Sequence, residues 1–375
     1  MGTKLRHVCC TMMVIVILAA STNSAVANTE DTPNVHSEAA VLMSAKSGEV
    51  LFDKEANQKM YPASITKIVT GILAIEQGNL KDKVTISENA VDVIGTSVYL
   101  LENEEMKLEQ LVQGLLINSG NDAGTAIAEH MAGSEEAFAE QMNTFVEEQV
   151  GVSNTHFTNP HGLYDDDHYT TAADMAKITK YAMKNSTFRE IVATEELEWI
   201  GEGWETTLYN HHQLVRDHEE VTGVKNGFVS QSGFTLVTTY ETDNDEYIAV
   251  TLNAPTTNDS YHDTKRLLEY GVDTYDTKTV EKGKQFEDGY GNEYILEHTT
   301  SITYEKDADL QFDIRNGSLI IEDDDQVIRT EPLKQIEEEV EEEVEEEVEE
   351  EEKVEVHQEE NPTFIDRLLQ FLNLK

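Results

Sequence analysis

The chain has 375 residues, with 27 Lys and Arg against 74 Asp and Glu, so its formal net charge is −47. This excess of negative charge excludes a protein that grips DNA or RNA electrostatically, because the phosphate backbone is also negative. The length allows one large domain and a smaller one.

The first 27 residues have the pattern of a secretory signal peptide. Basic residues precede an apolar run from Val8 to Ala20, and Ala25 to Ala27 supply the small residues of a cleavage site. The alternative is an uncleaved anchor, although the run is shorter than the roughly 20 residues that a spanning helix needs. Cleavage removes the only two cysteines, Cys9 and Cys10. We therefore expect a mature protein that acts outside the cytoplasm, at the outer face of the cell membrane.

Residues 28–280 are expected to form the main domain, with strands at both ends and helices between them. β-rich runs at 40–44 and 49–52 predict one hairpin, and runs at 234–240 and 247–252 predict a second. Helical periodicity occurs over residues 64–75, 108–117, 123–131, 135–149, 172–183 and 264–270. This order predicts an α/β fold of the α+β type, in which helices flank one antiparallel sheet and form a lobe in the middle of the chain. A functional site is expected at the seam between sheet and lobe.

In residues 281–335 the sequence pattern changes from long helical segments to short β-like runs, which predicts a small all-β module. Short β-like runs at 294–296, 301–304 and 318–321 are separated by turn residues such as Gly289 and Gly317. The Gly-Tyr-Gly sequence that begins at Gly289 is a turn and not a phosphate loop, because no helical pattern follows it.

The C-terminal 40 residues divide into a spacer and a short helix. Residues 336–360 are rich in Glu, and this density of like charge favours a solvated, self-repelling linker. In residues 361–375, Asn361 and Pro362 suit the start of a helix whose apolar side chains fall on one face. That helix is too short to span a bilayer but suits the membrane surface. The alternative is that it folds back onto the globular part.

The apolar helical segment at 64–75 has a lysine in its first turns. Lys67 lies three residues after Ser64, so its amine and the hydroxyl share one helical face. Burial disfavours an ammonium ion, and a lysine with a lowered pKa can accept the proton of a serine. Backbone N–H groups at the start of the helix would stabilise a developing anion. The alternative is that Ser64 caps the helix and Lys67 extends to water.

Two further short motifs with polar side chains follow the Ser64–Lys67 motif along the chain. Ser119 and Asn121 flank a glycine between two helical patterns, where a hydroxyl and an amide would project from a tight turn. Lys225, Asn226 and Gly227 come before Phe228 near the second hairpin, where a glycine lets a substrate backbone approach a strand. Each segment alone is equally an ordinary turn or strand start, but together with the first motif they reinforce one another.

The ordered motifs resemble those of the low-molecular-weight penicillin-binding proteins, the serine D-alanyl-D-alanine carboxypeptidases. The resemblance covers about residues 38–275. It includes the segments Tyr61–Lys67, Leu115–Ala123, Asn159–Leu163 and His168–Met175. It implies a serine hydrolase that cleaves peptidoglycan stem peptides and forms covalent adducts with β-lactam antibiotics.

The resemblance also implies a role for each motif residue. Ser64 is the nucleophile, Lys67 the base for acylation, and Ser119 the relay of a proton toward the leaving amine. Asn121 holds Lys67 and the amide of the substrate. The remaining residues bind substrate: Lys225, Asn226 and Gly227 beside its terminal carboxylate, and the Phe228 N–H, with that of Ser64, at the oxyanion.

Two departures from the family pattern concern carboxylate recognition. Asn226 stands where the family usually has Thr, and residues 256–264 lack the Arg that relatives commonly carry there. The alternatives are therefore a serine β-lactamase on the same fold and a weakly active or non-catalytic protein that binds cell-wall peptide. No metal or cofactor is expected, because His211 and His212 lack the spacing of a zinc site and are expected at the surface or in a turn.

Overall fold

A computed structural model describes residues 32–336 of the chain. The expected signal peptide at 1–27 lies outside the described residues. So do the expected helix at 361–375 and all of the expected linker after Ile336, and these features stay predictions. No helix within residues 32–336 combines the length and the apolar composition that crossing a bilayer requires.

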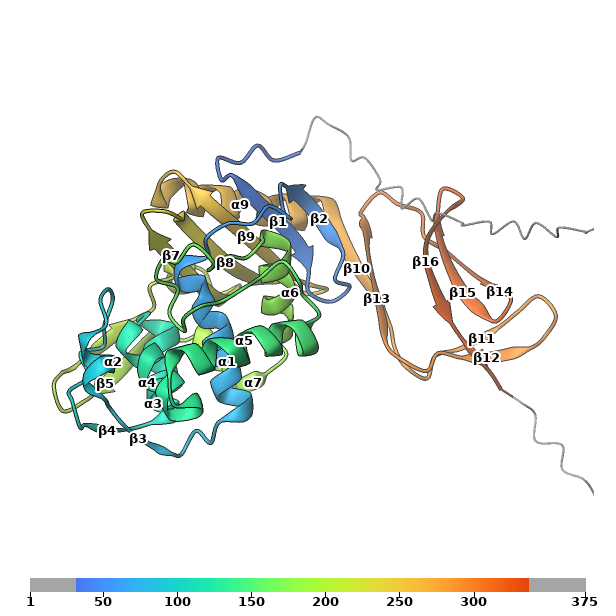
Figure 1. The fold of residues 1–375 in the computed structure, drawn as a ribbon. Coiled ribbons are helices and arrows are strands. Elements are labelled where there is room, and N and C mark those ends of the chain that lie inside the picture. Colours follow the sequence, from blue (N-terminus) through green and yellow to red (C-terminus); the bar gives the residue numbers. More distant parts are fainter. Residues whose placement is uncertain (1–31, 337–375) are drawn as a thin grey trace, which may run out of the picture. The chain divides into compact units, whose positions relative to one another are not determined.

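A five-stranded antiparallel sheet forms the centre of the main domain, in the order β2-β1-β9-β8-β7 (Figure 1). Both predicted hairpins are confirmed, and the two ends of the domain meet where β1 pairs with β9. The sequence did not identify β7 as a full strand. The bounds are β1 (Ala39–Ser44), β2 (Val50–Lys54), β7 (Val221–Val229), β8 (Gly233–Glu241) and β9 (Glu246–Ala254).

Helices cover both faces of this sheet, which explains why every residue of β1 is buried. Alternate side chains of β1 enter two separate apolar clusters. One cluster contains α1 (Lys67–Gln77) and α6 (Ala172–Ala182), and the other contains α9 (Thr257–Thr274). Helix α9 is longer than predicted because Thr256 caps its start, with a hydroxyl that accepts the Asp259 N–H at 3.1 Å.

The helical lobe lies in the middle of the chain, as predicted, and packs against α1. Its helices are α2 (Glu88–Asp92), α3 (Leu108–Ile117), α4 (Asn121–Ala132), α5 (Glu135–Phe145) with a following π turn η2 (Val146–Val150), and α7 (Ser186–Val192). The short helix α8 (Gln213–Asp217) lies outside the lobe, where it contacts β7 and shares an apolar cluster with α9. Two small two-stranded sheets were not predicted, since each strand has only three to five residues. They pair β3 (Lys83–Thr85) with β4 (Glu105–Lys107), and β5 (Glu196–Ile200) with β6 (Glu205–Tyr209).

The described residues after α9 form strands and no helix, in agreement with the all-β structure predicted for this region. Its strands form three small sheets around a core of Ile302, Leu319 and Ile321. The strands are β10 (Tyr275–Val280), β11 (Gln285–Glu287), β12 (Glu293–Ile295), β13 (Thr300–Glu305), β14 (Gln311–Arg315), β15 (Ser318–Asp323), β16 (Gln326–Pro332) and β17 (Lys334–Gln335).

Candidate active site

Ser64 and Lys67 lie beside each other where the sheet meets the helical lobe. Ser64 is in a 3₁₀ turn, η1 (Ala63–Thr66), and Lys67 is the first residue of α1. Lys67 Nζ is 3.1 Å from Ser64 Oγ. The alternative in which Lys67 extends to water is wrong, because the residue is 0% exposed. The helix α1 follows Thr66 as its N-cap, so Ser64 is not the capping residue either.

The amine of Lys67 is held by oxygen atoms from distant parts of the chain. Nζ donates to Asn121 Oδ1 and to the His161 carbonyl oxygen, each at 2.7 Å. Burial lowers the pKa of Lys67 well below its usual range, the charge of Lys225 lowers it further, and Asp122 opposes this in part. An uncharged amine at this position can accept the proton of Ser64.

Ser119 and Asn121 lie in the junction between α3 and α4. Ser119 is buried and has a φ of 66°, which places it in the tight turn that the sequence predicted. The Asn121 side chain donates from Nδ2 to the Ile94 carbonyl oxygen at 2.7 Å, so that Oδ1 faces Lys67. A side chain on Gly95 would lie 2.5 Å from Asn121 Nδ2, so the glycine makes room for this amide.

Strand β7 brings Gly227 against the backbone of Ser64. A Cβ atom at Gly227 would lie 2.7 Å from the Ser64 amide nitrogen and 2.6 Å from Thr235 Oγ1. Thr235, on β8, donates to the Pro62 carbonyl oxygen at 2.9 Å and so ties the sheet to the turn before Ser64. The glycine therefore permits close approach between strand and turn. The approach of a substrate backbone, which the sequence suggested, stays a prediction.

The other residues of this motif differ in exposure. Lys225 is 1% exposed and donates to the carbonyl oxygen and to Oδ1 of Asn226, at 3.0 and 3.2 Å. Burial lowers the pKa of Lys225 to about 7. Phe228 is exposed, and its ring packs on Phe234 with the centroids 4.5 Å apart.

The loop Asn159–Leu163 supplies contacts that the motifs alone did not indicate. Its His161 carbonyl binds Lys67, and the His161 ring is 3.3 Å from a carboxylate oxygen of Glu135. Gly162 has a φ of +88°, and a side chain there would overlap the Ala63 carbonyl oxygen. The one sequence feature that could have revealed this loop was the family resemblance, which included these five residues.

The expectation for the paired histidines is wrong in one case. His212 is 1% exposed, and its Nε2 lies 2.8 Å from Thr238 Oγ1. Burial lowers its pKa to about 3, so the ring is neutral near pH 7. Since β8 covers it, a polar residue that looked solvent-facing in the sequence belongs to the interior.

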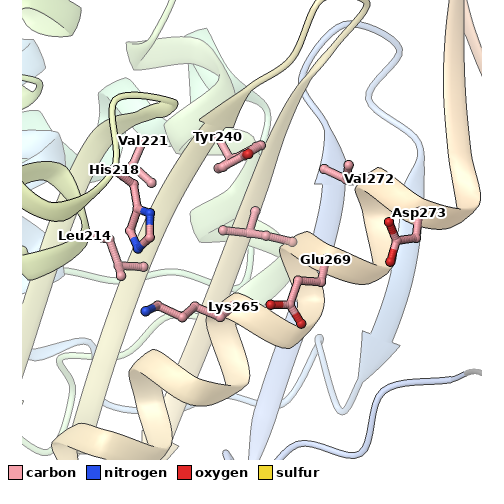
Figure 2. Close-up of a pocket in the computed structure, with 9 residues that line it drawn as sticks. Leu214, His218, Val221, Tyr240, Lys265, Glu269, Val272 and Asp273 are labelled. Carbon is pink, nitrogen blue, oxygen red and sulfur yellow. The ribbon is translucent and has the colours of Figure 1, made fainter.

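A separate pocket of about 220 Å³ lies beside α9 and is distinct from the Ser64 site (Figure 2). Leu214, Val221 and Tyr240 form part of its apolar wall. Lys265 and Glu269 of α9 lie at the same pocket in the figure. Its lining comes from α8, α9 and the outer part of the sheet, so it is not the place where Ser64 would meet a substrate.

Comparison with known proteins gives one family. A family model described as D-alanyl-D-alanine carboxypeptidase matches residues 26–256. The chain is 34% identical over 253 residues to the D-alanyl-D-alanine carboxypeptidase DacF of Bacillus subtilis, covering 66% of this chain and 64% of that relative. It is 34% identical over 275 residues to DacA of Haemophilus influenzae, covering 68% and 66%. The match thus spans slightly less than two thirds of the length of these two relatives.

Solved structures with the same fold are named for related activities. Penicillin binding protein 5 from Haemophilus influenzae superposes with a TM-score of 0.72 at 28% identity, covering 81% of this chain and 97% of that one. Penicillin binding protein 6B from Escherichia coli gives 0.69 at 25% identity, covering 80% and 95%. The DD-transpeptidase of Streptomyces K15 gives 0.61 at 27% identity, covering 64% and 98%. These likenesses confirm the predicted mixed fold.

Proposed function

Since this chain belongs to the D-alanyl-D-alanine carboxypeptidase family, we propose that it is a serine carboxypeptidase acting on peptidoglycan stem peptides. It removes the terminal D-alanine through an acyl-enzyme and reacts with β-lactams at the same serine. The observation that carries this proposal is the 3.1 Å approach of a fully buried lysine amine to Ser64 Oγ. Burial of the amine supplies the reason for its reactivity.

The acylation step uses the pair Ser64 and Lys67. The Ser64 oxygen attacks the carbonyl carbon of the penultimate D-alanine while its proton passes to the neutral Lys67 amine. The C–N bond then breaks, and the leaving D-alanine amine takes up a proton relayed by Ser119. Water next attacks the ester, which regenerates the Ser64 hydroxyl and releases the shortened peptide.

The negative charge that develops on the carbonyl oxygen needs preorganised donors. The backbone N–H groups of Ser64 and Phe228 are our candidates, because Gly227 brings β7 against the Ser64 nitrogen. Each such donor contributes about 3 kcal/mol to transition-state stabilisation in acyl-transfer enzymes. Asn121 holds the Lys67 amine and, in this proposal, the substrate amide as well.

Recognition of the terminal carboxylate is assigned to Lys225 and Asn226. A buried ammonium group beside the nucleophile attracts an anionic peptide terminus, and a pKa of about 7 leaves Lys225 largely charged only below neutral pH. The Asn226 side chain already accepts from Lys225. Its bulk and geometry differ from those of a hydroxyl, so we expect weakened carboxylate binding and not a dead enzyme.

The location of the enzyme is part of the proposal. The signal pattern at 1–27 supports export across the cytoplasmic membrane. The apolar face expected at 361–375 supports contact with the membrane surface. With a net charge of −47, that contact must depend on apolar burial and not on attraction to anionic lipid.

The test is release of D-alanine from a synthetic peptide that ends in D-Ala-D-Ala, followed together with hydrolysis of a penicillin. Wild type should release D-alanine and keep the penicillin as a slowly lost adduct, and Ser64→Ala should do neither. Rapid penicillin turnover without a lasting adduct would identify a β-lactamase instead. Equal D-alanine release by wild type and Ser64→Ala would refute the assignment of the nucleophile, and absence of release from folded wild type would refute the activity.

A further inference from the structure

Apart from the Ser64 site, a cluster of histidine and aspartate side chains lies on the α9 side of the sheet, on the opposite face from α1. His36 is in the segment before β1, and His262 and Asp263 are adjacent residues of α9. One ligand atom from each of the three lies within 4.8 Å of the others. The sequence did not reveal this group, because 226 positions separate His36 from His262.

The spacing of these atoms suits a transition metal ion. His36 Nδ1 is 3.0 Å from Asp263 Oδ1 and 4.0 Å from Asp259 Oδ1. Two ligands bound to one zinc ion in tetrahedral geometry at about 2.0–2.1 Å are themselves about 3.3–3.4 Å apart. The first distance is slightly shorter than this and the second is longer, and each reaches it with a side-chain movement of under about 1 Å.

The two carboxylates are held with one oxygen free to face His36. Asp263 Oδ2 accepts the backbone N–H of His36 at 2.8 Å and both the N–H and the hydroxyl of Ser37 at 2.7 Å. Asp259 Oδ2 accepts from Thr256 Oγ1 at 2.7 Å. Each carboxylate therefore presents Oδ1 to the imidazole, and such outer contacts orient the ligands of metal sites.

Asp263 is the buried member of this group. Its side chain is 0% exposed. The three donors to Oδ2 fix the carboxylate in place, while Oδ1 faces the His36 ring. A buried and oriented carboxylate of this kind is typical of the ligands in metal sites.

We propose that His36, His262 and Asp263, with Asp259 as a fourth ligand, bind one zinc ion that fastens the segment before β1 to α9. Two imidazoles and two carboxylates make a donor set that zinc accepts in tetrahedral geometry. The ion takes the place of the proton between His36 Nδ1 and Asp263, and His36 binds it as a neutral imidazole whose ring proton is on Nε2. The site is structural and takes no part in the chemistry at Ser64.

The competing explanation is a simple ion pair between His36 and Asp263. That pair accounts for the 3.0 Å contact but not for His262, whose ring lies with its centroid 6.0 Å from that of His36 at an angle of 68°. His262 is exposed, so its position beside the pair is not required by core packing. The contribution of His262 is therefore the feature that separates the two explanations.

The experiment uses the mature full-length protein without a polyhistidine tag, stripped with a chelator and titrated with zinc chloride in a calorimeter. We expect one saturable site whose affinity falls at least about tenfold in His262→Ala and in His36→Ala. The matched control is His218→Ala, which removes another exposed histidine and should leave the affinity unchanged. All three replaced side chains are exposed, so the variants are expected to fold.

Cobalt(II) provides a second readout that does not depend on heat or stability. A tetrahedral site with two imidazoles gives visible d–d absorption, which should appear in wild type and in His218→Ala and disappear in His262→Ala. Equal zinc affinity and equal cobalt spectra in wild type and His262→Ala would overturn the proposal. Absence of saturable zinc binding by folded wild type would overturn it equally.

Discussion

Gly227 lies so close to Ser64 that a methyl group on its α-carbon would be 2.7 Å from the Ser64 amide nitrogen. Real Cβ atoms do not approach a backbone atom this closely, so a larger residue must push β7 and the turn η1 apart. The proposed oxyanion donors come from these same two segments.

Gly227→Ala is therefore expected to slow acylation by a penicillin about 100-fold, since misplacing a catalytic group by 1 Å has an effect of this order. The measurement is the second-order rate constant for covalent labelling. Gly289→Ala is the matched control, because a Cβ there meets no atom within 4 Å. Labelling by Gly227→Ala at the rate of the control would contradict this role for the strand.

The two buried lysines predict a bell-shaped pH dependence of kcat/KM for a peptide that ends in a free D-Ala-D-Ala carboxylate. Activity should rise with pH as Lys67 loses its proton. The midpoint of this rise should be at a pH well below the usual pKa of a lysine, because the pKa of Lys67 is lowered. Activity should fall again above about pH 7, where Lys225 loses the charge that attracts the carboxylate. With a peptide amidated at its C-terminus, the falling limb should be absent. A rate that still increases at pH 10 would show that Lys67 keeps an ordinary pKa.

Asn226→Thr is expected to increase kcat/KM on D-Ala-D-Ala peptides by roughly tenfold, because one hydrogen bond to a charged group contributes about 1.5 kcal/mol or more. The Thr hydroxyl can donate to the substrate carboxylate and is smaller than the Asn226 amide, whose Oδ1 now accepts from Lys225 Nζ. Asn226→Ser should give a similar gain, since it also places a hydroxyl there. If both variants are as slow as wild type or slower, the asparagine is suited to another substrate.

Two glycines in the left-handed region separate backbone strain from steric overlap. Gly162 has φ +88° and is packed against the Ala63 carbonyl, and Gly151 has φ +79° with open space around it. Gly151→Ala should lower the free energy of unfolding by about 1–2 kcal/mol through conformation alone. Gly162→Ala should lower it more, and equal losses in urea unfolding would mean that the loop yields to the added methyl group.

Local patterns were sufficient for the arrangement of Ser64 and Lys67, because three residues of a helix fix which side chains share a face. The sheet built from both ends of the domain also followed from the hairpin patterns. The contact of Lys67 with the His161 carbonyl did not, since it joins residues 94 positions apart through a backbone atom. The start of α9 was placed too late because its first turns are polar and carry no apolar periodicity. Tertiary packing, and not the local preference of the sequence, determines both the Lys67–His161 contact and the start of α9.

The measurement that tests the account most directly is identification by mass spectrometry of the residue that a reporter penicillin modifies. The reactivity of the Ser64 hydroxyl depends on the buried amine beside it, so the adduct should be found on the peptide that contains Ser64. It should be absent in Ser64→Ala and form far more slowly in Lys67→Met, which keeps the length of the side chain without the amine. An adduct on another side chain, or an unmodified Ser64 in folded protein after prolonged exposure, would contradict the account.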